Sequence, residues 1–215
     1  MPHETEPFGI ILMNLGTPQA PTPRSIRRYL KDFLSDPRVV ELPRLPWWLL
    51  LNLVILPLRS RKIAKAYQHI WQAEGSPLRV ISLQQRDQLQ QRLDEDLGMG
   101  RCVVSLAMTY GQPDLQGAWS ELKQRGIEKI FVLPLYPQYS ATTTGAAFDQ
   151  ISRLFQQERV LPELRFCRDY AIHPAYIEAL ATSVERHWAT VENKQPAARF
   201  LLLSFHGIPQ RCIDL

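Results

Sequence analysis

Four short apolar runs constrain the fold of this chain more than any other feature of its sequence. Apolar and polar residues do not alternate within them, and they comprise Phe8–Leu15, Cys102–Met108, Ile130–Leu135 and Phe200–Phe205. Continuous runs of this length, bounded by turn residues, are typical of strands buried on both faces, as in a parallel sheet. The sequence therefore predicts an α/β fold with a mainly parallel sheet.

Helical patterns lie between the apolar runs. Thr22-Pro23 and Ser76-Pro77 each combine an N-cap residue with proline at the first helical position, which predicts helices running to about Leu34 and Leu93. Further elements are expected at Leu115–Gln124 capped by Asp114, from Thr143 or Thr144 to about Gln156, at Pro174–Trp188, and as a short strand at Leu164–Phe166. Strand and helix thus alternate, with an elaborated insertion expected between Thr22 and Leu93.

Composition excludes several protein classes. The 215 residues, 45% of them hydrophobic, suffice for a substantial core, and the net charge of +4 is spread out, so no nucleic-acid partner is expected. Three scattered cysteines, Cys102, Cys167 and Cys212, favour neither a disulfide framework nor a CxxC pair. The acidic start of the chain does not match a secretory signal, and Leu45–Leu58 is too short to span a bilayer. We therefore expect a cytoplasmic protein.

Glycine, tyrosine, threonine and histidine residues follow the apolar runs. In parallel sheets ligands bind beyond the carboxyl ends of the strands, so these residues are expected to meet at one edge. The segments are Asn14–Pro18, Thr109–Pro113, Tyr136–Gly145 and Ser204–Pro209. Glycine and proline after one strand are ordinary turn chemistry, but their recurrence after four runs favours a ligand site. No glycine-rich phosphate-binding motif follows any run, so nucleotide binding is a minor alternative.

His206 is the candidate catalytic residue among the five histidines. It follows the last apolar run and precedes Gly207, whereas His69, His173 and His187 fall on or beside expected helices with no partner at metal-ligand spacing. An imidazole at the end of a strand can act as a general base or as a metal ligand. No nearby carboxylate or second histidine in the sequence completes a metal site with it.

Together these segments closely resemble ferrochelatase, the family of enzymes that insert ferrous iron into a porphyrin in haem synthesis. The resemblance covers nearly all 215 residues and rests on motifs that occur in family order. They are Asn14-Leu15-Gly16-Thr17-Pro18, Tyr29-Leu30-Lys31-Asp32-Phe33-Leu34-Ser35-Asp36, Gly75-Ser76-Pro77-Leu78, Pro134-Leu135-Tyr136-Pro137-Gln138-Tyr139-Ser140 and Ser204-Phe205-His206-Gly207-Ile208-Pro209. The sequence is most similar to the bacterial branch of the family.

The resemblance implies two Rossmann-like domains, each a parallel sheet flanked by helices, that hold the porphyrin in a cleft between them. Residues 1–140 are similar to the first domain with its porphyrin lip, and residues 141–215 to an incomplete start of the second. Members of the family continue beyond this region and carry there an acidic residue that faces the histidine. The resemblance therefore implies that this chain, as an N-terminal portion, is weakly active or inactive by itself.

The site residues of the family carry over by motif. His206 resembles the active-site histidine, which either binds the metal or accepts the pyrrole protons. Three residues are similar to those that contact the edge and the propionates of the porphyrin, namely Arg59, Tyr67 and Ser76. Five others resemble residues of the pocket wall, namely Leu15, Tyr110, Tyr136, Thr142 and Thr143. Thr109 departs from some relatives, which carry arginine there.

The implied substrates are ferrous iron and protoporphyrin or coproporphyrin, between which the sequence does not decide. No cofactor is expected within the chain, because three scattered cysteines fall short of the four that an iron–sulfur cluster needs. Leu45–Leu58 resembles the lip over the pocket, and its Trp47 and Trp48 offer a peripheral membrane contact. A non-catalytic tetrapyrrole-binding module and a chelatase for a cobalt or sirohaem-type ring are the alternatives, and the oligomeric state is left open.

Overall fold

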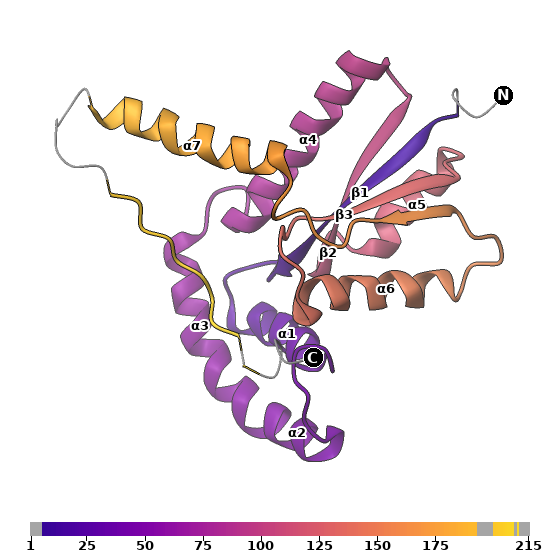
Figure 1. The fold of residues 1–215 in the computed structure, drawn as a ribbon. Helices are drawn as coiled ribbons and strands as arrows, with labels where there is room; N and C mark the ends of the chain where they lie inside the picture. The colour runs from indigo at the N-terminus through magenta and orange to yellow at the C-terminus, as the bar shows by residue number, and fades with distance from the viewer. Residues whose placement is uncertain (1–5, 193–199, 209, 211–215) are drawn as a thin grey trace. The chain divides into compact units, whose positions relative to one another are not determined.

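The computed structural model describes residues 6–192, 200–208 and 210 (Figure 1). Contacts divide the chain into a first unit that ends at Arg168 and a second unit that begins at Asp169. Each unit is described by itself. This division concerns contacts within the present chain, and the domain boundary expected after residue 140 stays a prediction.

A four-stranded sheet forms the centre of the first unit. Its strands are β1 (Phe8–Thr17), β2 (Cys102–Gly111), β3 (Lys129–Pro134) and β4 (Glu163–Phe166). They pair in the order β2-β1-β3-β4, and every pair is parallel. The first three apolar runs and the short strand are therefore confirmed, and so is the expected parallel α/β architecture.

Helices occupy the long interval between β1 and β2, as expected for an elaborated insertion. They are α1 (Pro23–Leu34), α2 (Arg44–Leu50), a π-helical turn at Leu51–Ile55, α3 (Leu56–Ile70) and α4 (Pro77–Leu97). Thr22 and Ser76 cap α1 and α4 as the sequence predicts, because their hydroxyls accept hydrogen bonds from the N–H groups of Ser25 and Arg79. Figure 1 shows α1, α2 and α3 grouped beyond the carboxyl ends of β1 and β2.

Two helices follow β2 and β3. Asp114 caps α5 (Leu115–Gln124), with the bounds that the sequence predicts. The expected cap of α6 (Ala146–Phe155) at Thr143 or Thr144 is wrong, because Ser140 has the extended backbone of a cap and its hydroxyl accepts from the Thr142 N–H. A π-helical turn, Ala141–Gly145, then leads into the helix.

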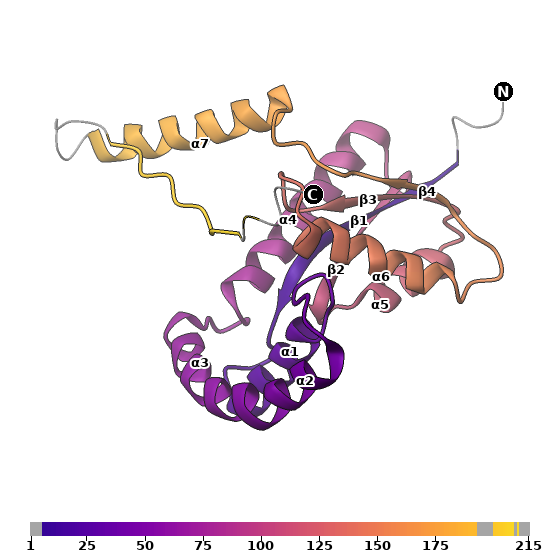
Figure 2. The ribbon, with the colours of Figure 1, turned by 60° about the horizontal axis from the view of Figure 1, so that its bottom comes forward.

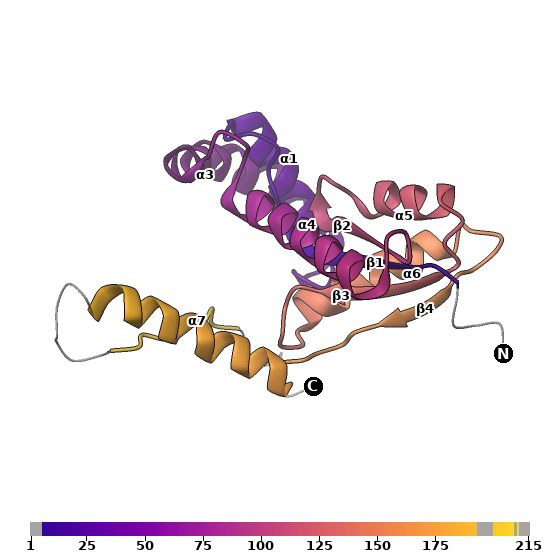
Figure 3. The same ribbon diagram turned by 90° about the horizontal axis from the view of Figure 1, so that it is seen from above.

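The sheet lies between two helical layers (Figure 2, Figure 3). On one face, α5 and α6 bury a core that includes Trp119 and Ile151 against Ile11, Met13 and Val132. On the other face, Leu83, Leu89 and Leu93 of α4 pack with Ile10, Leu12 and Leu106. Burial on both faces explains the continuous apolar runs in β1, β2 and β3.

A side chain, instead of another strand, pairs with the outer edge of β2. Gln90 of α4 donates from Nε2 to the Cys102 carbonyl at 3.0 Å and accepts the Val104 N–H at 2.7 Å. Its amide thus takes the place of a peptide group in a neighbouring strand. Free peptide groups at a sheet edge invite pairing with another chain, and Gln90 satisfies two of them.

The second unit contains α7 (Pro174–Glu192), which extends beyond the predicted end at Trp188. The strand predicted at Phe200–Phe205 is wrong, because these residues form no strand and Phe200, Leu202 and Phe205 are 86%, 92% and 79% exposed. A strand requires a hydrogen-bonded partner, and the residues that the structure describes in this unit contain no other strand. An apolar sequence is therefore not sufficient by itself to form a strand.

Candidate ligand-binding site

Two cavities open at the carboxyl ends of β1 and β2. One has a volume of about 590 Å³ and is lined in part by Asp36, Thr109, Tyr110 and Gly111. The other has a volume of about 240 Å³ and is lined in part by Thr17, Tyr29, Asp32 and Gly111. Three of the four strand-end segments therefore meet at one edge, as predicted, because β3 also lies beside β1 and the Leu135 N–H donates to the Met13 carbonyl.

Close backbone contact between β1 and β2 explains one of the glycines at this edge. Gly16 has a φ of 106°, and a Cβ atom on it would lie 1.7 Å from the carbonyl oxygen of Tyr110. Both observations exclude any residue with a side chain at this position. The glycine in the Asn14–Pro18 segment thus lets the two strand ends approach each other at the site.

Four tyrosines lie at this edge, and we call Tyr29, Tyr67, Tyr110 and Tyr136 the tyrosine cluster. They come from α1, α3, β2 and the segment after β3. Tyr29 stacks on Phe33 with ring centroids 6.1 Å apart, and Phe33 packs edge-on against Tyr110 at 5.3 Å. The hydroxyl of Tyr136 hydrogen-bonds to Oγ1 of Thr109 at 3.3 Å. Tyr67 and Tyr29 both pack against the buried cluster that includes Ile26 and Leu56. A negative charge on Tyr67 or on Tyr136 also raises the pKa of Tyr29.

Burial raises the pKa values of three of these phenols, Tyr29, Tyr110 and Tyr136. It is the largest cause that raises the pKa values of Tyr29 and Tyr110 well above the usual range, and neighbouring tyrosines add to both shifts. Burial also raises the pKa of Tyr136 to about 12, although its hydrogen bond with Thr109 acts in the opposite direction. Tyr29, Tyr110 and Tyr136 therefore offer flat aromatic surface and neutral hydroxyl groups, and they supply no base at neutral pH.

Asp36 is a buried acid beside the tyrosine cluster; it belongs to the Tyr29–Asp36 motif, but the sequence assigns it no role at the site. Its side chain accepts the Tyr110 hydroxyl at 2.9 Å and the Arg38 backbone N–H at 2.8 Å. Tyr29 and Phe33 belong to the same motif and likewise have no predicted role at the site. They lie four residues apart on α1, a spacing that places both rings on one helix face and could have indicated a shared aromatic surface.

The other predicted site residues of the first unit take different places. Leu15 is half-buried near the end of β1, and Thr142 and Thr143 lie in the π-helical turn after Tyr136. Ser76 is buried as the cap of α4, and Arg59 is exposed on α3. Tyr67, Tyr110 and Tyr136 come together in the tyrosine cluster. The porphyrin contacts expected of these residues stay predictions.

The lip, Leu45–Leu58, is an exposed apolar surface formed by α2, the π-helical turn and the start of α3. Its exposed side chains include Leu45 at 71%, Trp48 at 54%, Leu53 at 70% and Leu58 at 71%. Trp47 has a different role, because it packs into the core with Ile26 and its Nε1–H donates to the Leu34 carbonyl at 2.7 Å. No helix in the part of the chain that the structure describes is long and apolar enough to cross a membrane.

His206 belongs to the second unit and its side chain is exposed. Its expected place at the ligand site, and its role toward metal or protons, stay predictions. Among the described residues, no group of three or more histidine, cysteine, aspartate or glutamate side chains is arranged to hold a metal ion. Cys102 is a buried free thiol, Cys167 is half-buried, and Cys212 lies outside the described residues.

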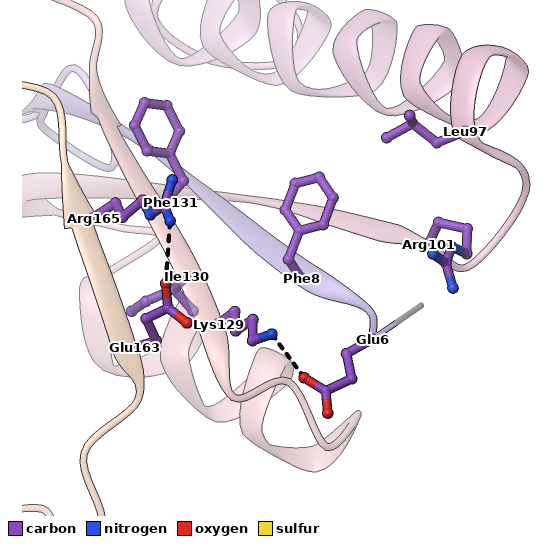
Figure 4. Close-up of a pocket in the computed structure, with 9 residues that line it drawn as sticks. All are labelled: Glu6, Phe8, Leu97, Arg101, Lys129, Ile130, Phe131, Glu163 and Arg165. Atoms are coloured by element: carbon purple, nitrogen blue, oxygen red, sulfur yellow. Dashed lines mark hydrogen bonds and ion pairs between the residues drawn. The ribbon is translucent and has the colours of Figure 1, made fainter. Parts of the chain in front are cut away.

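A larger cavity of about 850 Å³ lies at the opposite end of the sheet (Figure 4). It is lined by residues at the amino ends of β1, β3 and β4, including Phe8, Lys129 and Glu163. Ion pairs border it, with Lys129 Nζ 2.8 Å from Glu6. Ligands of parallel sheets bind at the carboxyl ends, so size alone does not make this cavity the functional site.

Comparison with known proteins identifies close relatives. The Ferrochelatase family model matches residues 7–215. A curated ferrochelatase from Aeromonas hydrophila is 50% identical over 207 residues, which cover 96% of this chain and 62% of the relative. The ferrochelatase of Thioalkalivibrio sulfidiphilus is 49% identical, with 96% and 54% covered, and that of Hamiltonella defensa is 51% identical, with 97% and 62% covered. The chain thus spans 54–62% of the length of these relatives.

Proposed function

The chain belongs to the ferrochelatase family, and from this premise we propose that it forms the porphyrin-holding part of an enzyme that inserts ferrous iron into protoporphyrin or coproporphyrin. The observation that carries the proposal is the tyrosine cluster at the carboxyl edge of the sheet. Flat aromatic walls suit a flat macrocycle, because each Å² of apolar surface removed from water contributes about 25 cal/mol. The exposed apolar lip adds further surface of the same kind.

Metal insertion also requires a proton acceptor. A porphyrin holds two N–H protons that must leave before the nitrogens bind iron, and the ring must bend to present their lone pairs. Tyr29, Tyr110 and Tyr136 cannot accept these protons near neutral pH, because burial raises their pKa values further above neutrality. We assign proton acceptance or iron binding to His206, whose neutral imidazole can do either. The exposed Arg59 is proposed to pair with a propionate.

Porphyrin titration tests the binding part of the proposal. Soret-band titration of this chain should give saturable binding, and Tyr136→Leu should weaken it by about tenfold, the effect of losing about 1.4 kcal/mol of contact. Phe155→Leu is the matched control, because Phe155 packs edge-on against Trp119 in the core beneath α5 and α6 and lines neither cavity. Equal effects of the two substitutions on affinity would contradict the assignment of the site.

Metal insertion tests the catalytic part. We expect this chain to insert Zn²⁺ or Fe²⁺ slowly or not at all, and a fusion with the remaining carboxyl-terminal part of the Aeromonas hydrophila relative to insert it readily. His206→Ala should abolish turnover in the fusion. Equal rates for the chain and the fusion would refute the need for the added part, and near-normal turnover of the His206→Ala fusion would remove His206 from the mechanism. Binding without insertion by the fusion would favour a non-catalytic tetrapyrrole-binding role.

We also propose that the lip rests on a membrane surface, where porphyrins partition. Its exposed leucines and Trp48 lie next to a basic stretch of α3. The exposed cations of this stretch are Arg59, Arg61, Lys62 and Lys65. Apolar side chains beside cations favour the interface of anionic lipids over bulk water.

A further inference from the structure

We propose that Asp36 is a positioning residue of the porphyrin site. Its carboxylate accepts the Tyr110 hydroxyl and so connects the wall of the site to the segment that leads into the lip. The inference rests on the proposed function and goes further by assigning a residue to which the sequence analysis gave no role. Its basis is a set of contacts that converge on one buried carboxylate.

Both oxygens of Asp36 are occupied by donors from different parts of the fold. Oδ2 accepts the hydroxyl of Tyr110, at the end of β2, at 2.9 Å. Oδ1 accepts the backbone N–H of Arg38 at 2.8 Å, and the Asp36 carbonyl accepts the N–H groups of Val39 and Val40, each at 3.0 Å. Asp36 is only 7% exposed and Tyr110 only 4%, so water does not compete strongly for these bonds.

Two residues, Phe33 and Asp36, restrain the phenol of Tyr110. Phe33 packs edge-on against the ring, and the carboxylate fixes the hydroxyl at its far end. Burial and the bond to Asp36 raise the pKa of Tyr110, so the phenol is a permanent donor to the carboxylate. A ring held at both its face and its tip presents a fixed surface to the cavity that Tyr110 lines.

The same segment anchors the beginning of the lip. The Leu34 carbonyl accepts Nε1–H of Trp47 at 2.7 Å, and the Ser35 carbonyl accepts from Arg44 at 3.0 Å. On the other side of Asp36, the guanidinium of Arg38 forms two hydrogen bonds with Asp149 of α6, at 2.8 and 2.9 Å. Asp36 therefore lies where the sheet, α6 and the lip are joined, and its bond to Tyr110 links the lip to the site.

Asparagine cannot reproduce this arrangement. Asp36 accepts one hydrogen bond at each oxygen, whereas the amide of asparagine has a single acceptor oxygen and an NH₂ group that only donates. Asp36→Asn must therefore place its NH₂ group against either the Tyr110 hydroxyl or the Arg38 N–H. Tyr110→Phe removes the competing hydroxyl and keeps the ring, so the two substitutions should not act independently.

A double-mutant cycle on porphyrin affinity tests the proposal. In Soret titrations of this chain, Asp36→Asn and Tyr110→Phe should each raise Kd about tenfold, the range expected for loss of a hydrogen bond to a charged group. The double variant should be no weaker than either single one. Asp87→Asn, an exposed aspartate on α4, is the control and should leave Kd unchanged. The ¹³Cζ signal of Tyr110 should shift in Asp36→Asn and not in Asp87→Asn.

The outcomes separate this inference from the proposed function. No saturable porphyrin binding by the unsubstituted chain refutes the proposed function. Normal binding that Asp36→Asn leaves unchanged refutes the positioning role, and independent, additive effects show that Asp36 acts through the loop and not through Tyr110. If Asp36→Asn does not fold, the porphyrin affinity of Tyr110→Phe is the test. Unchanged affinity after removal of the hydroxyl overturns the proposal.

Discussion

Replacing Trp48 with serine tests whether the lip binds a membrane surface. Trp48 is 54% exposed, which leaves roughly 80–135 Å² of the roughly 150–250 Å² of an aromatic side chain in contact with water. Transfer of that area into the lipid interface contributes about 2–3 kcal/mol at about 25 cal/mol per Å². Loss of the whole contribution corresponds to a decrease of about 30- to 150-fold in the partition constant. Trp48→Ser is therefore expected to decrease vesicle binding by up to this factor.

Co-sedimentation with vesicles of anionic phospholipid measures this constant. Met99→Ser is a suitable control, because Met99 is 89% exposed and lies outside the lip. Trp47→Ser should act differently, since it removes a packed side chain and its hydrogen bond to Leu34 and lowers the free energy of unfolding by about 3 kcal/mol or more. Unchanged vesicle binding by Trp48→Ser, or an equal loss in Met99→Ser, would refute the lip as the contact.

Other substitutions test the fold around the site. Gln90→Leu leaves two peptide groups at the edge of β2 unpaired, so it should lower the free energy of unfolding by about 2–4 kcal/mol in urea titrations and promote concentration-dependent association in light scattering. Gly16→Ala should destabilise the chain by about 4 kcal/mol or more, visible as loss of the cooperative thermal transition, because its Cβ would collide with the Tyr110 carbonyl. Hydrogen bonds from Arg38 lower the pKa of Asp149, so this pair stabilises the fold above the unfolded pKa of aspartate and the stabilisation is lost as pH falls through the lower folded value. Arg38→Gln should therefore flatten the acid limb of stability against pH, and an unchanged limb would contradict the assignment.

Local signals made much of the architecture predictable. Thr22, Ser76 and Asp114 were identified as helix caps from their neighbours alone, and the structure confirms all three. Capping depends on residues within one turn of the helix, so the information is contained in the sequence around it. The cap of α6 was misplaced because Ser140, Thr142, Thr143 and Thr144 all have side chains of the capping type, and the π-helical turn decides among them.

Tertiary contacts decided which residues share the site. The family resemblance predicts Tyr67, Tyr110 and Tyr136 as site residues. Only the structure places Tyr29 and Asp36 beside them, because Tyr29 stacks on Phe33 next to Tyr110 and Asp36 accepts the Tyr110 hydroxyl. The residues that meet come from α1, α3, β2 and the segment after β3, and no spacing rule relates positions so far apart. Trp47 and Trp48 make the same point, because adjacent residues of one type have opposite roles that depend on what packs beneath the helix.

The sequence by itself determined the order of strands and helices, the parallel sheet and the family of the protein, because these follow from apolar periodicity, capping and motifs read along the chain. Only the tertiary structure decided that Asp36 holds Tyr110, that Trp48 rather than Trp47 faces water, and that Phe200–Phe205 forms no strand. Each of these depends on whether a residue from a distant segment packs against or bonds to the one in question. A carboxylate positions another side chain, and an apolar run forms a strand, only when the fold brings a partner within hydrogen-bonding distance.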